Sequence, residues 1–537
     1  MTNERVYLST TIPYVNARAH LGHALELVQA DVLARYHRLA GDQVRSQTGT
    51  DDNSLKNVLA ADAEGISTAA LVDRNASAFA ALRDPLSLSF DDFIRTGSDP
   101  RHRPGVERLW RACAASGDLY RKRYEGLYCV GCEQFYRPAE LPDGLCPEHG
   151  TRPERVAEEN WFFRLSRYAG QLRDLITSGR LRIEPAARRN EVLGFIAGGL
   201  EDFSASRSTA RARGWGIPVP GDPDQVIYVW WDALGNYITA PGYGTGGEDY
   251  ERWWTGADRR LHLVGKGVLR FHAVYWPAIL LSAGEPLPTD ILVHDYLTIG
   301  GSKISKSGAA AGNETADPVE LVHRYGTDAV RWWLLREVPR VGDVDFTAAR
   351  LTARANDDLA NGLGNLVSRV VTLVHRYRQG KVPRQGEHPV ASAAGGQALA
   401  SAAGGRALAS AAGGRALAAA CQRAPERIAA ALSAFDFRAA TAAIWDVVDE
   451  ANRYVERAEP WLLARAERDG DPAAGRLLDE SLALLVGACS ELAIRLAPFL
   501  PDLAGRIRAA VDDSAGQLPA AEPVFPRLEA ASVGAAV

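Results

Sequence analysis

The chain has 537 residues, 46% of them hydrophobic and 24% charged, which is enough apolar sequence for two or three domains in one soluble molecule. Its formal net charge of -5 excludes a protein that coats nucleic acid through uncompensated lysines and arginines, although local RNA-binding patches stay open. We find neither a run of about 18 uncharged apolar residues nor a signal-peptide pattern, so we expect a cytoplasmic protein that does not contact membranes.

The beginning of the chain predicts an α/β fold. Residues 6–12 (VYLSTTI) are typical of a buried strand that a proline ends, and residues 20–37 have the periodicity of a helix. A second strand is expected at residues 44–50, and it leads directly into Asp51 and Asp52. Polar groups therefore gather where parallel strands end, which is the usual binding crevice of an open α/β sheet.

The middle and end of the chain have a different character. Further strands are predicted at residues 226–231, 261–264 and 291–293. Before them lies a stretch with clustered cysteines, many arginines and a Pro/Gly-rich exit, which indicates an inserted domain. From about residue 350 Ala, Leu and Arg dominate with few strand signals, and this predicts an α-helical bundle.

A nine-residue unit repeats in tandem from Ala391 to Leu417 (ASAAGGQAL, ASAAGGRAL, ASAAGGRAL), within a low-complexity segment at residues 391–420. The unit has too few large apolar groups to build a core and lacks the acidic ligands of calcium-binding nonapeptides. We interpret it as an expanded, mobile loop between helices and assign it no function.

The motif His20-Leu21-Gly22-His23 stands at the predicted helix start, where backbone N–H groups and the helix dipole favour phosphate. Two imidazoles there can donate to phosphate oxygens, and Gly22 leaves room for a flat base on the backbone. The motif alone is weak, because a pair of histidines on a helix is more often structural or part of a metal site.

A glycine-flanked loop at residues 301–307 (GSKISKS) carries two lysines three positions apart. Such loops can close over a polyphosphate, although short Lys/Ser loops are usually solvated surface. Two separate phosphate-directed elements on one α/β scaffold are much stronger evidence for a polyphosphate site than either element alone.

HLGH and SKISKS resemble the two signatures of class I aminoacyl-tRNA synthetases. The surrounding sequence (IPYVNARAHLGH, GLEDFSASR, YVWWDALGNYIT, LRFHAVYWPAIL, DPVELVHRYGTDAVRWWLLREVP) is similar to the methionyl-tRNA synthetases in particular, over most of residues 5–375 and again around 435–500. The resemblance implies ATP-dependent activation of L-methionine to methionyl-adenylate and its transfer to tRNA(Met) in protein biosynthesis. It also implies a Rossmann-like parallel sheet with an inserted zinc-binding domain, followed by a helical anticodon-binding bundle.

The resemblance divides the chain into consecutive regions. These are the first half of the catalytic Rossmann-like domain at 1–115, the inserted domain at 116–225, the second catalytic half at 226–295, the lysine loop and stem-contact region at 296–350, the anticodon-binding domain at 351–515, and a tail at 516–537.

The resemblance also assigns roles within the catalytic site. As catalytic groups that bind the phosphates and the departing pyrophosphate with Mg²⁺, it implies His20, His23, Lys303 and Lys306, with Gly22 at the adenine, Glu26 at the ribose, and Gly265 and Ser307 as further ATP contacts. Asp51 would pair with the substrate ammonium. The methionine side chain would be lined by Ile12, Tyr14, Trp230, Ala233, Leu234, Tyr237, Val268, Phe271 and His272, since aromatic rings make favourable contacts with a thioether. The alternative for each aromatic residue is ordinary core packing.

Two further sites are predicted outside the catalytic crevice. Cys129-x-x-Cys132 and Cys146-x-x-His149 form two knuckles with the ligand set of a closed tetrahedral zinc site, and free thiols on a surface loop fit this paired spacing poorly. The resemblance gives this Zn²⁺ a structural role in orienting the acceptor end of the tRNA. It also implies that Asn365, Arg369 and Trp461 read the CAU anticodon, although Trp461 could instead pack at a helix end.

The chain departs from the family pattern at three places. After Asp51 the family commonly continues with an acidic residue or Ala and then His-Gly, where this chain has Asp52-Asn53-Ser54. Gly267 stands where the family usually has an Asp that helps to hold the ribose, and the tract after Ser307 is longer than usual.

These departures leave two alternatives open. One is a paralogue that tolerates a methionine analogue or serves a biosynthetic pathway, and the fact that Met1 is the only methionine fits it, although chance and the Ala/Gly/Arg bias also explain that. The other is a non-catalytic protein that binds an amino acid or tRNA, which the presence of both histidines and both lysines opposes. We expect a monomer, because nothing after the helical region resembles the C-terminal dimerisation module of some relatives.

Overall fold

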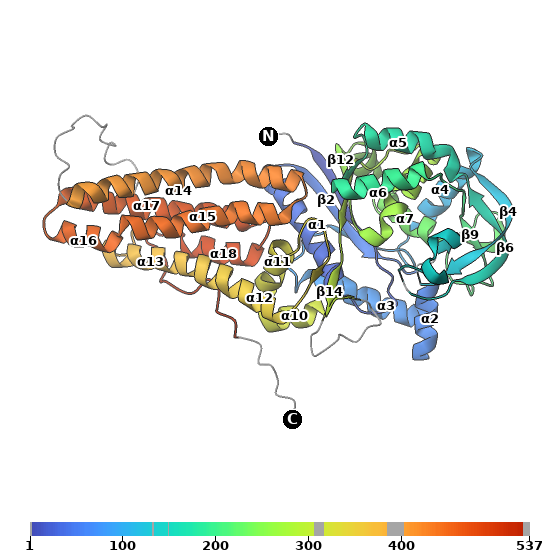
Figure 1. The fold of residues 1–537 in the computed structure, drawn as a ribbon, viewed down its shortest axis with the longest axis horizontal. Helices are drawn as coiled ribbons and strands as arrows, with labels where there is room; N and C mark the ends of the chain where they lie inside the picture. Colours follow the sequence, from blue (N-terminus) through green and yellow to red (C-terminus); the bar gives the residue numbers. More distant parts are fainter. Residues whose placement is uncertain (1–2, 132–133, 149, 305–315, 384–401, 530–537) are drawn as a thin grey trace, which may run out of the picture. The chain divides into compact units, whose positions relative to one another are not determined.

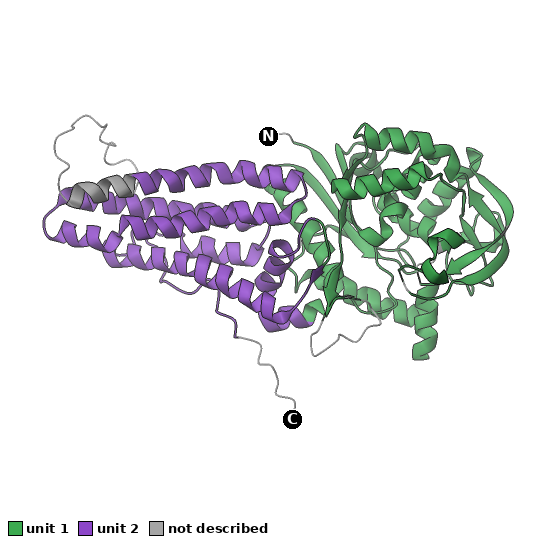
Figure 2. Ribbon diagram, in the orientation of Figure 1, with its two compact units in different colours: residues 1–319, 341–343 green, residues 320–340, 344–537 purple. Residues whose placement is uncertain are grey.

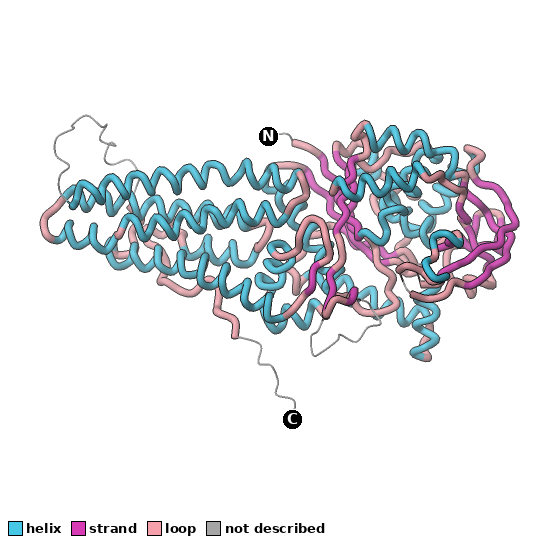
Figure 3. The backbone as a smooth tube through the Cα atoms, in the orientation of Figure 1, coloured by secondary structure: helices cyan, strands magenta, loops and turns pink. Residues whose placement is uncertain are grey.

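The computed structural model describes residues 3–131, 134–148, 150–304, 316–383 and 402–529. The chain forms two compact units (Figure 2): unit 1 comprises residues 1–319 with 341–343, and unit 2 comprises residues 320–340 with 344–537. Strands gather in unit 1, whereas unit 2 is built almost entirely of helices (Figure 3). Among the helices described, none combines the length and the apolarity that a membrane span requires.

A six-stranded parallel sheet forms the centre of unit 1 (Figure 1). Its strands lie in the order β3 (Asp92–Arg95), β2 (Gln43–Thr50), β1 (Arg5–Thr10), β12 (Arg259–Gly265), β13 (Asp290–His294) and β7 (Arg182–Glu184). The strands predicted at 44–50, 261–264 and 291–293 are confirmed, and the first strand ends at Thr10 rather than at residue 12. Because β1 lies between β2 and β12, the chain changes direction across the sheet at β1, and a crevice is expected beyond the carboxyl ends there.

Helices cover both faces of this sheet. Helix α1 (Leu21–Ala40) packs on β1, β2 and β12. On the opposite face Tyr7 and Val264 belong to a large apolar core that includes residues of α4 (His102–Ala115), α7 (Val229–Thr239) and α9 (Trp276–Ala283). Burial on both faces explains why the central strands read as nearly continuous apolar runs.

The remaining elements of unit 1 surround this centre. The helices are α2 (Leu55–Glu64), α3 (Thr68–Ala80), α5 (Ala169–Thr177), α6 (Ala186–Ala197) and α8 (Glu248–Tyr250). One small antiparallel sheet has the order β5 (Gln134–Tyr136), β4 (Leu119–Cys129), β6 (Glu154–Phe163) and β8 (Phe203–Ser204), and a second has the order β10 (Pro218–Val219), β11 (Asp222–Ile227) and β9 (Ser206–Ser208). β14 (Leu297–Ile299) pairs with β15 (Ser302–Lys303) just after the central sheet.

The strand predicted at residues 226–231 is wrong. β11 ends at Ile227 in the small three-stranded sheet, and α7 begins at Val229. The apolar run VIYVWW is therefore divided between the end of a strand and the first turn of a buried helix. A short apolar run cannot separate these two possibilities by its periodicity.

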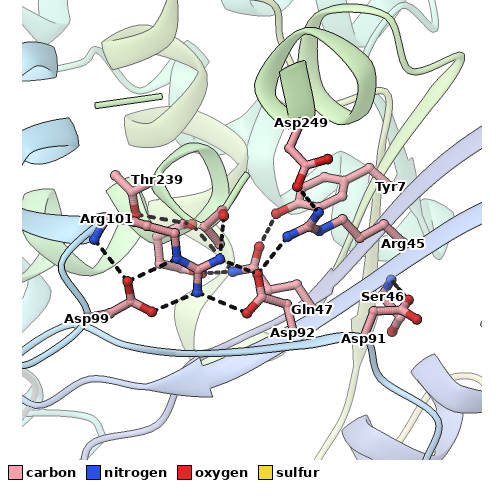
Figure 4. Close-up of polar contacts among 12 residues, drawn as sticks. Tyr7, Arg45, Ser46, Gln47, Asp91, Asp92, Asp99, Arg101, Thr239 and Asp249 are labelled. Atoms are coloured by element: carbon pink, nitrogen blue, oxygen red, sulfur yellow. Dashed lines mark hydrogen bonds and ion pairs between the residues drawn. The ribbon is translucent and has the colours of Figure 1, made fainter. Parts of the chain in front are cut away.

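A polar network ties the sheet to the end of α7 (Figure 4). Arg101 donates to both carboxylate oxygens of Asp92 on β3, at 2.7 and 3.0 Å, and to the carbonyl of Ala240 at 2.8 Å. Arg45 on β2 donates to the same Asp92 at 2.9 Å and to Asp249 at 2.8 Å. Burial would raise the pKa of Asp92, but the two guanidinium groups outweigh it and lower that pKa. The network fixes α7 against the sheet edge with charges that stay ionised.

Unit 2 is a bundle of helices. They are α10 (Pro318–Tyr325), which begins in unit 1, α11 (Thr327–Arg336), α12 (Ala348–Arg354), the π-helical stretch Ala355–Gly364, α13 (Asn365–Arg378), α14 (Ala402–Ser433), α15 (Phe437–Ala458), α16 (Pro460–Arg468), α17 (Pro472–Leu496) and α18 (Pro501–Ala510), with the short strand β16 (Val344–Asp345). Buried Arg331 on α11 donates to the carbonyls of Phe499 and Pro498, which fastens α11 to the loop before α18.

The interpretation of the Ala/Gly repeat as a loop is wrong for its second half. Helix α14 begins at Ala402 and contains the whole third copy, whereas residues 391–401 lie outside the described residues. Alanine has the highest helix propensity, and Leu417 of the third copy is fully buried. A Cβ on Gly413 would lie 3.0 Å from Cδ2 of Tyr454 on α15, so this glycine permits a close helix approach.

We expect Gly413→Ala to stabilise unit 2 less than Gly487→Ala, or to destabilise it. Gly487 lies on α17, and a Cβ there would meet nothing within 4 Å, so alanine should add about 0.5–1 kcal/mol through helix propensity alone. At Gly413 the same gain is opposed by the contact with Tyr454. Denaturant unfolding followed by circular dichroism measures both variants, and an equal gain at the two positions would contradict the close packing of the repeat.

Candidate functional site

A cavity of about 310 Å³ opens beyond the carboxyl ends of β1, β2, β12 and β13. Its lining combines a group of aromatic and apolar side chains with glycines, imidazoles and carboxylates. Of the residues that the sequence analysis assigned to the catalytic site, those lining the cavity are Ile12, Tyr14, His20, Gly22, His23, Glu26, Asp51, Trp230, Ala233, Leu234, Tyr237, Gly265, Val268 and His272. Residues of the HLGH motif thus share one space with residues that the resemblance assigned to the methionine pocket.

The described segments before and after residues 305–315 lie close to this cavity. Ile304 lines the cavity, and the carbonyl of Ala316 accepts a 2.8 Å hydrogen bond from the backbone N–H of Leu21, the first residue of α1. Lys303 belongs to β15, but its side chain, like Lys306 and Ser307, lies outside the described residues. The segment before residues 305–315 therefore lines the cavity, and the segment after them contacts the first residue of α1.

Reciprocal caps hold the two histidines at the start of α1. Nδ1 of His20 accepts from the backbone N–H of Gly22 at 3.1 Å, and Nδ1 of His23 accepts from the backbone N–H of His20 at 3.0 Å. The rings stack with 3.8 Å between centroids. Because Nδ1 accepts in both rings, the ring proton is placed on Nε2, and each neutral imidazole keeps an N–H donor. This is the capping-box arrangement with histidines in both roles.

Glu26 is held between β1 and β13. One carboxylate oxygen accepts from the backbone N–H and the hydroxyl of Thr11, at 2.6 and 2.5 Å, and the other lies 2.9 Å from Nε2 of His294. Burial would lower the pKa of His294, but the Glu26 carboxylate outweighs it and raises that pKa. Nδ1 of His294 lies 2.9 Å from the carbonyl of Asp295, so both ring nitrogens face acceptors. Glu26 therefore has a fixed orientation, and His294 is its cationic partner when protonated.

Asp51 accepts a hydrogen bond from the backbone of the loop that follows it, and the side chain of Asn53 connects this loop to α7. The backbone N–H of Asn53 donates to Oδ1 of Asp51 at 3.2 Å, and the Asn53 amide donates to Asp232 on α7 at 2.7 Å. Nε2 of His102 lies 2.5 Å from the other oxygen of Asp232, fully buried. Ser54 caps α2 by accepting from Lys56. Asn53 therefore connects the loop after β2 to the helix that carries one wall of the cavity.

The aromatic end of the cavity is built in two layers. The ring of Trp230 lines the cavity, with Tyr14 at its edge, 6.3 Å between centroids. Phe271, which the sequence analysis placed in the pocket, stacks face to face behind Trp230 at 3.9 Å and does not line the cavity. It supports the first layer.

Tyr237 and His272 form a polar pair inside this apolar end. Nδ1 of His272 donates to the carbonyl of Val268 at 2.9 Å, so Nε2 accepts from the Tyr237 hydroxyl at 2.8 Å. Burial lowers the pKa of His272 to about 4, and burial also raises the pKa of Tyr237. Both groups are therefore neutral at pH 7.

Several residues that line the cavity were missed in the sequence analysis. They are Thr11, Pro13, Asn236, His294, Asp295, Tyr296, Leu297 and Ile304, whereas Gly267, which the sequence analysis named at the ribose position, also lines the cavity. The positions from His294 to Leu297 directly follow a predicted strand, so the rule that drew attention to Asp51 would have found them too.

The predicted zinc ligands and anticodon residues lie on other parts of the structure. Cys129 at the end of β4 and Cys146 belong to one small buried cluster with Tyr136 and Leu141, and two backbone hydrogen bonds close the turn from Cys146 to Thr151. Their predicted partners Cys132 and His149 lie outside the described residues.

In unit 2, Asn365 and Arg369 lie on α13, and Trp461 lies on α16 with 41% of its side chain exposed. Both terminal nitrogens of Arg369 donate to one carboxylate oxygen of Glu456 on α15, each at 3.5 Å, and both side chains are exposed. An exposed tryptophan is available for contact with another molecule.

Comparisons with known proteins agree with this geometry. A family profile described as "tRNA synthetases class I (M)" matches residues 6–155 and 136–371. The "Methionine--tRNA ligase" of Brucella suis biovar 1 (strain 1330) is 39% identical over 550 residues, covering 98% of each chain. That of Mycobacterium tuberculosis (strain ATCC 25618 / H37Rv) is 40% identical over 518 residues, covering 96% of this chain and 92% of the relative.

Solved structures show the same similarity. "Mycobacterium tuberculosis methionyl-tRNA synthetase in complex with methionyl-adenylate" superposes with a TM-score of 0.86 at 38% identity, covering 98% of this chain and all of that one. The apo form from the same organism gives a TM-score of 0.81 at 35% identity, with 98% of each chain covered.

The buried neutral state of His272 predicts a pH dependence of stability. The unfolded chain binds a proton at this residue below about pH 6.5, whereas the folded chain does so only near pH 4, so stability should fall as the pH drops through this window. In His272→Gln the free energy of unfolding should fall less steeply as the pH drops. The slopes of the two proteins should differ by at most about 1.4 kcal/mol per pH unit. Denaturant unfolding between pH 4 and 7 measures the two slopes, and equal slopes would show that His272 is not held neutral.

Proposed function

The chain belongs to the methionyl-tRNA synthetases, class I enzymes that activate methionine with ATP and charge tRNA, and we propose which of its residues perform each step. The observation that carries the assignment is the single cavity at the carboxyl ends of β1, β2, β12 and β13. It joins the phosphate-directed start of α1 to an aromatic pocket that contains the buried carboxylate of Asp51.

ATP would bind at the glycine and imidazole end. The Nε2–H groups of His20 and His23 donate to phosphate oxygens, in line with the caps that commit both Nδ1 atoms to the backbone. Adenine packs on Gly22, Gly265 contacts the nucleotide, and Glu26 accepts from the ribose with lone pairs beyond those used by Thr11 and His294. Lys303, Lys306 and Ser307, with Mg²⁺, would hold the departing pyrophosphate.

Methionine would bind at the aromatic end. Its ammonium pairs with Asp51, and its thioether lies among Trp230, Tyr237 and His272, with Ile12, Tyr14, Ala233, Leu234 and Val268 completing the wall and Phe271 supporting it from behind. The neutral state of His272 supports this assignment, because an apolar thioether would be bound poorly beside a buried cation.

The two bound substrates then react without a general base of unusual pKa. The methionine carboxylate attacks the α-phosphorus, the bond from that phosphorus to the bridging oxygen breaks, and pyrophosphate leaves. A terminal ribose hydroxyl of tRNA(Met) next attacks the carbonyl carbon of the adenylate, its proton passes to a phosphate oxygen, and AMP leaves with the electron pair of the broken bond. Catalysis consists of positioning and charge stabilisation by the imidazoles and lysines.

We also assign the knuckles and unit 2. Cys129, Cys132, Cys146 and His149 would hold a structural Zn²⁺ that fixes the knuckles for the tRNA acceptor end, and the burial of Cys129 and Cys146 in one cluster fits such a site. Asn365, Arg369 and Trp461 would read the anticodon, which the exposure of Trp461 supports. We also propose that the enzyme acts as a cytoplasmic monomer.

The first test is ATP–pyrophosphate exchange screened across the amino acids. Methionine should support exchange; Asp51→Asn should raise the KM for methionine about 10- to 100-fold, because a charge-assisted contact is lost. Lys306→Ala should lower the exchange rate about 100-fold through lost charge stabilisation. Lys122→Ala is a matched control, since Lys122 packs over Phe162 outside the cavity. Absence of exchange with every amino acid would favour the non-catalytic alternative.

The second test separates tRNA recognition from activation. Trp461→Ala should reduce kcat/KM for charging tRNA(Met) about 10- to 100-fold, since one base–aromatic stack is lost, and should leave pyrophosphate exchange unchanged. Ile494→Ala is the control, because Ile494 also lies in unit 2 and is similarly exposed, at 45% against 41% for Trp461. If both variants charge tRNA equally well, Trp461 does not read the anticodon.

A further inference from the structure

A tyrosine from a neighbouring strand end fills the space above one glycine of the cavity. Gly267 and Tyr296 both line the cavity, Gly267 just after β12 and Tyr296 just after β13. A Cβ built on Gly267 would lie 2.0 Å from the Tyr296 hydroxyl oxygen and 3.3 Å from its Cζ. No side chain at position 267 can coexist with this position of the tyrosine, so the hydroxyl provides the polar group at this point of the wall.

Several contacts hold Tyr296 in place. Its backbone N–H donates to Asp343 at 2.9 Å, and the same carboxylate oxygen lies 2.7 Å from the Lys266 ammonium. That ammonium lies over the tyrosine ring, 4.5 Å from its centroid. At the tip, the hydroxyl donates to a carboxylate oxygen of Glu148, at 3.4 Å. The ring is thus fixed at its backbone, its face and its hydroxyl.

Tyr296 follows two residues after His294, whose Nε2 lies 2.9 Å from a carboxylate oxygen of Glu26 and whose ring would lie 3.5 Å from a Cβ on Gly265. We propose that Tyr296 is a nucleotide-positioning residue whose hydroxyl binds a ribose hydroxyl of ATP. This inference rests on the proposed function, because it assigns the sugar of the nucleotide to one wall of the same cavity.

The chemistry of the hydroxyl suits a sugar. Burial and the nearby Glu148 carboxylate raise the pKa of Tyr296, so the group stays protonated at neutral pH. When its proton is directed to Glu148, its oxygen lone pairs accept from a ribose hydroxyl; when the proton turns, it donates instead. Glu148 lies between the predicted zinc ligands Cys146 and His149, so the contact also connects the knuckle to the nucleotide end.

The test removes the hydroxyl of Tyr296 from the enzyme and one ribose hydroxyl at a time from ATP. Methionine-dependent pyrophosphate exchange is measured with ATP, 2′-deoxyATP and 3′-deoxyATP, for the unaltered enzyme and for Tyr296→Phe. The variant should raise the KM for ATP about fivefold with little change in kcat or in the KM for methionine. Its preference for ATP over one of the two deoxynucleotides should also be about fivefold lower than that of the unaltered enzyme, because the ribose hydroxyl missing from that deoxynucleotide no longer has a partner in the variant.

Tyr120→Phe is the matched control. Its hydroxyl donates to Asp202 at 2.8 Å and is remote from the residues that line the cavity, so its nucleotide preference should equal that of the unaltered enzyme. If Tyr296→Phe keeps the full preference for ATP over both deoxynucleotides, the tyrosine does not bind the sugar and the inference is overturned.

A second pair of variants tests the geometry itself. Gly267→Ala should lower the thermal midpoint and the preference for ATP together, because its Cβ displaces the hydroxyl. Adding Tyr296→Phe should recover the midpoint but not the preference, and failure to recover it would overturn the packing argument. Absence of exchange in the unaltered protein would instead overturn the proposed function, so the two failures are distinct.

Discussion

The reciprocal caps of His20 and His23 determine what the rest of the cavity can do. Each imidazole commits its Nδ1 to the backbone at the start of α1, so each is fixed in ring plane and in tautomer before any ligand arrives. The helix start is itself held over the crevice between β1 and its neighbours, where its N–H groups favour an anion. Positioning of charge is the main source of rate in phosphoryl transfer, and we propose that this helix cap provides it.

Buried polar contacts then align the two ends of the cavity. Asn53 joins the loop after β2 to Asp232 on α7, and His102 holds the other oxygen of that carboxylate. The arginine network of Figure 4 fixes the far end of the same helix against β2 and β3. A shift of α7 would move Tyr237 and Leu234 relative to Asp51, so these remote contacts maintain the shape of the proposed amino-acid pocket. Asn53, which stands where the chain departs from the family pattern, thus contributes a bond to α7.

The sequence predicted the parts of this arrangement that depend on local pattern. The strands at 44–50, 261–264 and 291–293 and the helix after HLGH follow from periodicity, and the rule that ligands bind beyond parallel strand ends placed Asp51 in the crevice. Prediction from the sequence failed where the outcome depends on packing against distant segments. VIYVWW is divided because the three-stranded sheet takes up only its first two residues, the third Ala/Gly repeat is helical with Leu417 buried and Gly413 against Tyr454 of α15, and Phe271 stands behind Trp230 because α7 brings that ring against it.

The glycines at the nucleotide end show why sequence patterns alone cannot describe such a site. A glycine in a binding motif is read as free space for the ligand, yet a Cβ on Gly22 would lie 3.0 Å from the ring of His20, and one on Gly267 would meet the Tyr296 hydroxyl. In both places the missing side chain makes room for another protein group, which then faces the cavity. The chemistry at a glycine is therefore set by its neighbour, and for Gly267 that neighbour comes from the end of a different strand. Position 267 carries no carboxylate, but the wall of the cavity there is still polar, because the Tyr296 hydroxyl reaches it from the adjacent strand end.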